Sequence, residues 1–124
     1  MTRKEQALAL HAKGYNCAQS VFMTMSKYTG VPESQAADLA TGFGGGAGCR
    51  EICGALSGAI MAAGAALGAE QRPQVMALTR ELTEEFRTRF GSLRCGELKA
   101  NRVPCDDLIA FCAEKMDGLL RKEG

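Results

Sequence analysis

Signals for helix starts and stops recur along the whole chain and leave little room for strands. Thr2 with Glu5, and Asn16 with Gln19, have the spacing of capping boxes, which mark helix N-termini. Apolar residues at helical spacing follow these caps, and no segment alternates polar and apolar residues as a half-buried strand does. Three prolines open further apolar segments of the same kind: Pro32, Pro73 and Pro104. The sequence therefore predicts an all-α, single-domain bundle of about five to six helices over residues 1–124.

The most apolar stretch runs from Ile52 to Leu67 and is mostly alanine and glycine. A membrane span needs about 20 strongly apolar residues, so this stretch is predicted to be a buried central helix, without membrane insertion. Glycine costs a helix about 1 kcal/mol relative to alanine. Gly54 and Gly58, on one side of this helix, therefore predict the close approach of a neighbouring helix, with self-association as a homodimer as the alternative.

The charge balance excludes several classes of partner. Fifteen basic and fourteen acidic residues give a formal net charge of +1, and tryptophan is absent. A nucleic-acid partner held mainly by charge, or by stacking on aromatic side chains, is not expected. The charged N-terminal residues lack the continuous apolar core of a signal peptide, which predicts a cytoplasmic location.

A glycine-rich loop precedes the small-residue helix. Residues 42–47, Gly-Phe-Gly-Gly-Gly-Ala, match the letters of a dinucleotide fingerprint. A helical segment rather than a strand comes before them, and no Gly-Lys-Ser/Thr follows, so no nucleotide is expected. The loop could bring its backbone close to an anion, a cluster or another helix, or it could simply pack tightly. Four glycines are candidates for binding a cofactor: Gly44, Gly45, Gly46 and Gly54.

Six cysteines are the most distinctive chemical feature. In a reducing cytoplasm such residues are more often catalytic or metal-binding than disulfide-bonded, although a cysteine can also be a small core hydrophobe. Four cysteines fall at or near predicted helix starts, where unpaired N–H groups and the helix dipole favour a thiolate. They are Cys17, Cys49, Cys105 and, one turn beyond Cys49, Cys53. Cys53 lies four residues after Cys49, so the two would share a helix face and suit one metal.

The remaining candidates are weaker. Cys95 lies between the last two predicted helices, where Arg94 and Lys99 could lower its pKa or be ordinary solvated charges. Cys112 fits the apolar stripe of the last helix and is predicted to be a core residue. His11, the only histidine, is expected to have no role.

The pattern resembles the family of redox-active proteins named for the cysteine motif C–GCAxxG–C–C. The shared features span about residues 4–118 and include Asn16-Cys17-Ala18-Gln19-Ser20, the 42–46 glycine loop, Cys53-Gly54-Ala55-Leu56-Ser57-Gly58, Phe90-Gly91-Ser92, Cys95 and Cys105. The resemblance implies that Cys17, Cys53, Cys95 and Cys105 are the recurrent cysteines, with Cys49 and Cys112 as additions. A related domain occurs joined to c-type cytochromes, which implies an iron–sulfur cluster. Haem is not expected, because Cys-x-x-Cys-His is absent.

Three hypotheses follow. In the first, Cys17, Cys53, Cys95 and Cys105, with Cys49 as a further candidate, converge at one end of the bundle. There they bind an iron–sulfur cluster or another thiophilic metal, zinc being less favoured, or undergo reversible thiol oxidation with an unidentified redox partner. In the second, the chain is a metal-free thiol–disulfide oxidoreductase or redox sensor. In the third, it is a non-catalytic helical interaction module.

Overall fold

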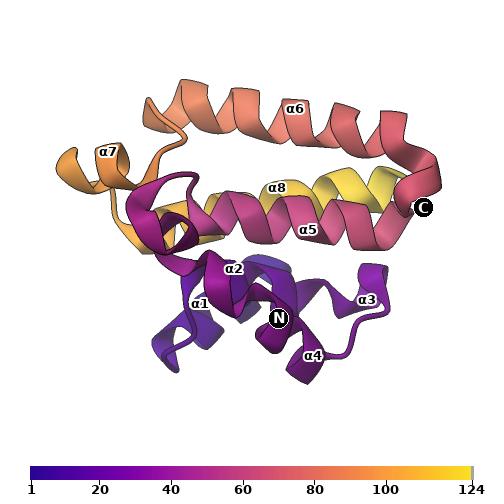
Figure 1. Cartoon of the computed structure of the whole chain (residues 1–124). Coiled ribbons are helices and arrows are strands. Elements are labelled where there is room, and N and C mark those ends of the chain that lie inside the picture. The colour runs from indigo at the N-terminus through magenta and orange to yellow at the C-terminus, as the bar shows by residue number, and fades with distance from the viewer. Residues whose placement is uncertain (124) are drawn as a thin grey trace.

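Helices make up most of the computed structural model, which describes residues 1–123 (Figure 1). The only strand-like pairing in that range is one isolated antiparallel bridge between Ile52 and Arg94. The all-α fold class predicted from the sequence is therefore confirmed. The helices are α1 (Arg3–Ala12), α2 (Cys17–Phe22), α3 (Ser26–Thr29), α4 (Glu33–Ala40), α5 (Gly54–Leu67), α6 (Arg72–Phe90), α7 (Cys95–Ala100) and α8 (Cys105–Glu123).

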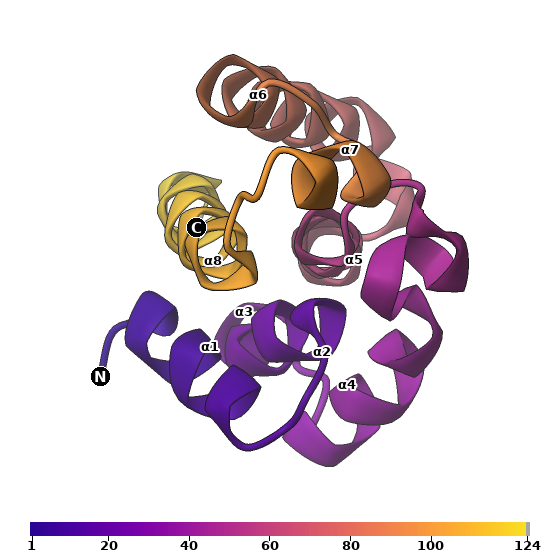
Figure 2. The same ribbon diagram turned by 90° about the vertical axis from the view of Figure 1, so that its left-hand side faces the viewer.

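The central helix is α5, the small-residue helix. It packs against α2 on one side and against α6 and α8 on the other, and α8 also packs on α1 (Figure 2). The short helices α1 to α4 lie together on one side of the long α5, and α7 lies at the end of the bundle where α8 begins (Figure 1). No helix within residues 1–123 combines the length and the apolar character needed to cross a membrane.

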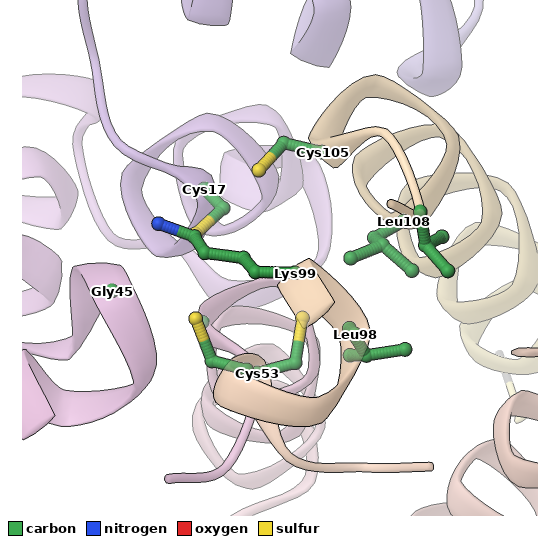
Figure 3. Close-up of a pocket in the computed structure, with 10 residues that line it drawn as sticks. Cys17, Gly45, Cys53, Leu98, Lys99, Cys105 and Leu108 are labelled. Carbon is green, nitrogen blue, oxygen red and sulfur yellow. The ribbon is translucent and has the colours of Figure 1, made fainter. Parts of the chain in front are cut away.

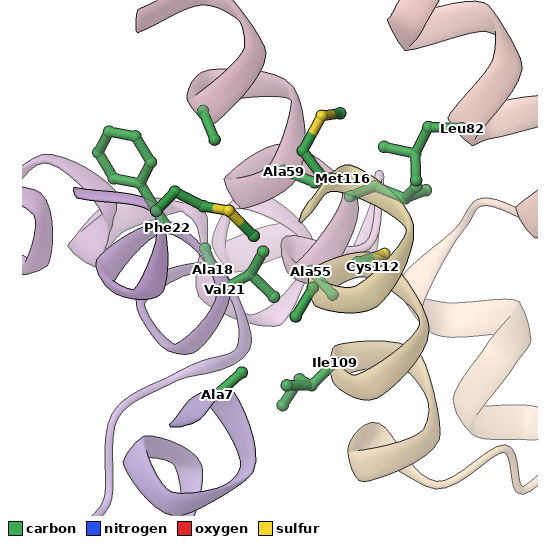
Figure 4. Packing of buried hydrophobic residues seen from close by; sticks show 14 of the residues in the cluster. Ala7, Ala18, Val21, Phe22, Ala55, Ala59, Leu82, Ile109, Cys112 and Met116 are labelled. Carbon is green, nitrogen blue, oxygen red and sulfur yellow. The ribbon is translucent and has the colours of Figure 1, made fainter. Parts of the chain in front are cut away.

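The core forms where α2, α5, α6 and α8 meet. Phe22, Leu82, Ile109 and Met116 are almost completely buried there (Figure 4). The apolar stripe predicted for the last helix is buried along α8, and it includes Cys112, which has no exposed surface. Burial of these stripes accounts for the stability of the bundle, because each buried large apolar side chain contributes about 1.5–3 kcal/mol.

The glycines of α5 let α2 pack unusually close. A Cβ atom added at Gly58 would lie 2.5 Å from the carbonyl oxygen of Ala18 on α2. Further along the same helix, a Cβ added at Gly64 would meet nothing within 4 Å. The predicted close approach of a neighbouring helix is therefore confirmed for Gly58, and the neighbour is α2. Homodimer formation stays a prediction.

The structure contains more and shorter helices than the sequence predicts. The Asn16–Gln19 capping box and the apolar residues after it predict one helix, whereas residues 17–29 form α2, a 3₁₀ turn over Met23–Met25, and α3. In this turn the Thr24 hydroxyl donates a hydrogen bond to the Val21 carbonyl over 2.7 Å, which competes with regular helical bonding. A second difference is α7, which occupies residues expected to be a connection.

Candidate functional site: a pocket lined by four cysteines

Four of the six cysteines line a single pocket of about 60 Å³ at one end of the bundle. Cys17, Cys95 and Cys105 are the first residues of α2, α7 and α8, and Cys53 is the N-cap of α5. Figure 3 shows Cys17, Cys53 and Cys105, from three separate helices, grouped in this pocket. The rest of the lining is mostly apolar: Gly45, Gly54, Leu98, Lys99, Val103 and Leu108. The N-termini of four helices therefore meet at one group of thiols.

Cys17 is positioned by the capping box that precedes it. The Asn16 side chain accepts a hydrogen bond from the Gln19 N–H, and the Gln19 side chain accepts one from the Asn16 N–H, each over 2.9 Å. The Cys17 sulfur then lies directly over Gly54, where an added Cβ would be 2.7 Å from it. A residue with a side chain at position 54 would therefore displace the sulfur.

The isolated bridge positions Cys53 and Cys95. The Cys53 N–H donates to the Leu93 carbonyl over 2.8 Å, and the Cys95 N–H donates to the Glu51 carbonyl over 2.6 Å. Successive residues of paired extended segments point to opposite faces. Cys53 and Cys95 therefore share the face opposite to Ile52, which is 43% exposed. The two thiols are diagonal neighbours across the bridge.

The predicted glycine positions surround this group of thiols. Gly45 and Gly54 line the pocket. A Cβ at Gly44 would lie 2.5 Å from the Asn16 side chain, and one at Gly46 would lie 2.8 Å from the Cβ of Cys95. The loop thus packs tightly around the cysteine-bearing segments. Its binding of a cofactor is not shown and stays a prediction.

Cys49 does not share a helix face with Cys53, so that prediction is wrong. It lies in a tight turn over Gly46–Arg50 that precedes α5, it is exposed, and it is not among the residues lining the pocket. Gly48 and Arg50 have φ angles of +73° and +61°. Such left-handed conformations interrupt a right-handed helix, so α5 begins only at Gly54.

Burial keeps two pocket thiols protonated. Desolvation raises the pKa of Cys53 to about 12, although the backbone N–H groups of Leu56 and Ala55 at the start of α5 lower it. Burial also raises the pKa of Cys105, and the nearby Cys17 raises it further, whereas Lys99 lowers it. The expectation that helix starts would favour thiolates therefore does not hold for these two residues, because desolvation outweighs the helix N-terminus.

Cys112 lies in the core, and burial raises its pKa well above the usual range. We expect Cys112→Ala to lower the free energy of unfolding by about 1–2 kcal/mol, because it leaves a small cavity in a close-packed region. The reactivity of the pocket thiols should not change. Urea unfolding and thiol counting check the two expectations, and a lost pocket reactivity would contradict the assignment of Cys112 to the core.

Metal-ligand geometry is absent from the described residues. Within residues 1–123, no three His, Cys, Asp or Glu side chains are grouped closely enough to hold a metal ion. All six cysteines are free thiols. His11 does not line the pocket, and its Nδ1 pairs with Oδ1 of Asp106 over 2.8 Å.

The fold and the pocket define a small all-α protein in which helix N-termini converge on four thiols. The family model described as "Putative redox-active protein (C_GCAxxG_C_C)" matches residues 15–119. The chain belongs to this family. Comparisons with curated proteins and with solved structures found no match.

Proposed function

We propose that the four-cysteine pocket is a redox site that works by thiol–disulfide exchange with a partner disulfide. The observation that carries the proposal is the convergence of Cys17, Cys53, Cys95 and Cys105 on one pocket as free thiols. In the exchange, two pocket thiols lose two protons and two electrons as an S–S bond forms between them. The S–S bond of the partner breaks, takes up both electrons and both protons, and leaves two partner thiols.

We infer that Cys53 and Cys95 are the pair that forms this bond. They share one face of the bridge as diagonal neighbours. Such neighbours are about 7–8 Å apart, so the two sulfurs must move closer together when the S–S bond forms. The raised pKa of Cys53 makes it a poor first nucleophile near neutral pH. We therefore assign the first attack on the partner disulfide to Cys95 and the closing of the intramolecular disulfide to Cys53.

An iron–sulfur cluster is a second candidate, favoured by the donor set. Four thiols from four helices match the ligand number of a cluster or of a closed zinc site. Cys17, Cys53, Cys95 and Cys105 would hold the group, and a cluster would supply one-electron transfer. The side chains would have to move closer together than they are here. Binding would also release the thiol protons, so affinity would rise with pH.

Anaerobic purification followed by metal and sulfide analysis separates the two candidates. Iron with sulfide and the absorption bands of a cluster would support the second candidate, and zinc alone would indicate a non-redox metal site. A metal-free protein that forms an intramolecular disulfide between two pocket cysteines on mild oxidation would support thiol exchange. A protein with neither metal nor disulfide would contradict both and leave a helical interaction module.

Substitution of Cys95 should abolish the intramolecular disulfide. Without the Cys95 sulfur, Cys53 has no partner across the bridge, so we expect complete loss of the disulfide in Cys95→Ser. Cys49→Ser is the matched control, because Cys49 is exposed and does not line the pocket. Non-reducing peptide mass spectrometry after mild oxidation measures both. Retention of a disulfide involving Cys53 in Cys95→Ser would show that the pairing is different.

A further inference from the structure

Lys99 is the only residue with a charged side chain among those that line the cysteine pocket. It lies on α7 four residues after Cys95, so both side chains lie on nearly the same helix face. Figure 3 shows the Lys99 side chain extending across the pocket, with its terminal nitrogen on the side away from Leu108. The residue itself is exposed, so its charge lies at the mouth of the pocket.

The Lys99 ammonium is available to a ligand. Within residues 1–123 it takes part in no salt bridge, whereas the neighbouring Arg94 pairs with both Glu51 and Glu97. Its field reaches the Cys105 thiol, since it lowers the pKa of Cys105 against the effect of burial. The opposing charge near Cys105 is Asp106, whose carboxylate pairs with His11 over 2.8 Å.

We propose that Lys99 makes the pocket selective for a small anionic reaction partner, such as a carboxylate-bearing disulfide. A single positive charge at the mouth of a small, mostly apolar pocket raises the local concentration of anions and stabilises their approach to the sulfurs. The inference rests on the proposed function, in which the pocket thiols react with an outside sulfur compound. Lys99 is a specificity-determining residue in this scheme and takes no part in bond making.

Two alkylating probes of nearly equal size test this selectivity. Iodoacetate is anionic and iodoacetamide is neutral, and each reacts when a thiolate sulfur forms an S–C bond and iodide leaves. Because both consume the same thiolate, the ratio of their rates at one cysteine cancels any change in thiol pKa. We expect the iodoacetate-to-iodoacetamide ratio at Cys17 and Cys105 to fall about two- to fivefold in Lys99→Met, from the loss of one nearby charge. Lys99→Arg should retain it, and about 0.5 M salt should reduce it in the unsubstituted protein.

The chain provides two controls. Cys49 is exposed outside the pocket, so its ratio should not change in Lys99→Met. Lys122→Met removes a lysine near the opposite end of α8 and should leave the ratios at Cys17 and Cys105 unchanged. An unchanged ratio at Cys105 in Lys99→Met, or an equal fall at Cys49, would overturn the inference. The assay uses the reduced, metal-free protein and needs no disulfide, so its outcome is independent of the test of the proposed function.

Discussion

Iodoacetamide should modify Cys53 about a thousandfold more slowly near neutral pH than it modifies a cysteine in an unstructured peptide. Burial raises the pKa of this thiol from an ordinary value of 9.0 to about 12. Three pKa units correspond to a roughly thousandfold smaller fraction of thiolate, which is the reacting species. The 3% exposure of the side chain adds to the effect, because reagent access is also restricted. Site-resolved mass spectrometry of timed samples measures the rate.

The pH dependence provides the sharper check. Since the pKa of Cys53 is about 12, its rate should rise tenfold for each pH unit and show no plateau up to about pH 10. An ordinary thiol levels off above about pH 9. In urea-unfolded protein, Cys53 should react as the peptide does. A plateau near pH 9 in the folded protein would contradict the raised pKa of Cys53. Cys53 could then act as the first nucleophile.

Gly58→Ala should lower the free energy of unfolding by about 1–3 kcal/mol, or prevent folding altogether. The new methyl group would lie 2.5 Å from the Ala18 carbonyl oxygen. That oxygen belongs to the backbone of α2, so no side-chain rotation relieves the contact and α2 must move as a unit. Because α2 begins with Cys17, the same shift should disturb the pocket and change the alkylation rate of Cys17.

Gly64→Ala is the matched control within the same helix. A Cβ at this position meets nothing within 4 Å, and alanine is favoured over glycine in a helix by about 1 kcal/mol. The control should therefore be slightly more stable than the unsubstituted protein, while Gly58→Ala is less stable. Urea denaturation followed by circular dichroism measures both. Equal stability of the two variants would show that α2 does not pack on Gly58 as closely as described.

Local features of the fold could be predicted from the sequence because their causes are local. Both capping boxes form as predicted, with Thr2 bonded to Glu5 and Asn16 bonded to Gln19. The last helix begins directly after Pro104, at Cys105. The fixed φ angle of proline suits a helix start, where its missing N–H costs no helical hydrogen bond. In each case the deciding interaction lies within one turn of the chain.

The bridge beside the pocket could not be predicted in this way. The two segments that form it, 51–53 and 93–95, are too short to show a strand pattern and are far apart in the sequence. Their pairing ends the irregular segment that holds Cys49 and fixes Cys95 at the start of α7. The sequence alone predicts that Cys49 belongs to the helix of Cys53 and that Cys95 lies in a connection between helices.

The sequence by itself determined the all-α class and predicted the close approach of a helix at Gly58, and its resemblance to the cysteine-motif family indicated the four recurrent cysteines. Only the tertiary structure decided that Cys17, Cys53, Cys95 and Cys105 line one pocket and that burial keeps Cys53 protonated near neutral pH. Helix starts are set by neighbouring residues, whereas desolvation depends on elements brought together from the whole chain. The helix N-termini could therefore be predicted from the sequence. The protonation state of Cys53 could not, because it depends on burial.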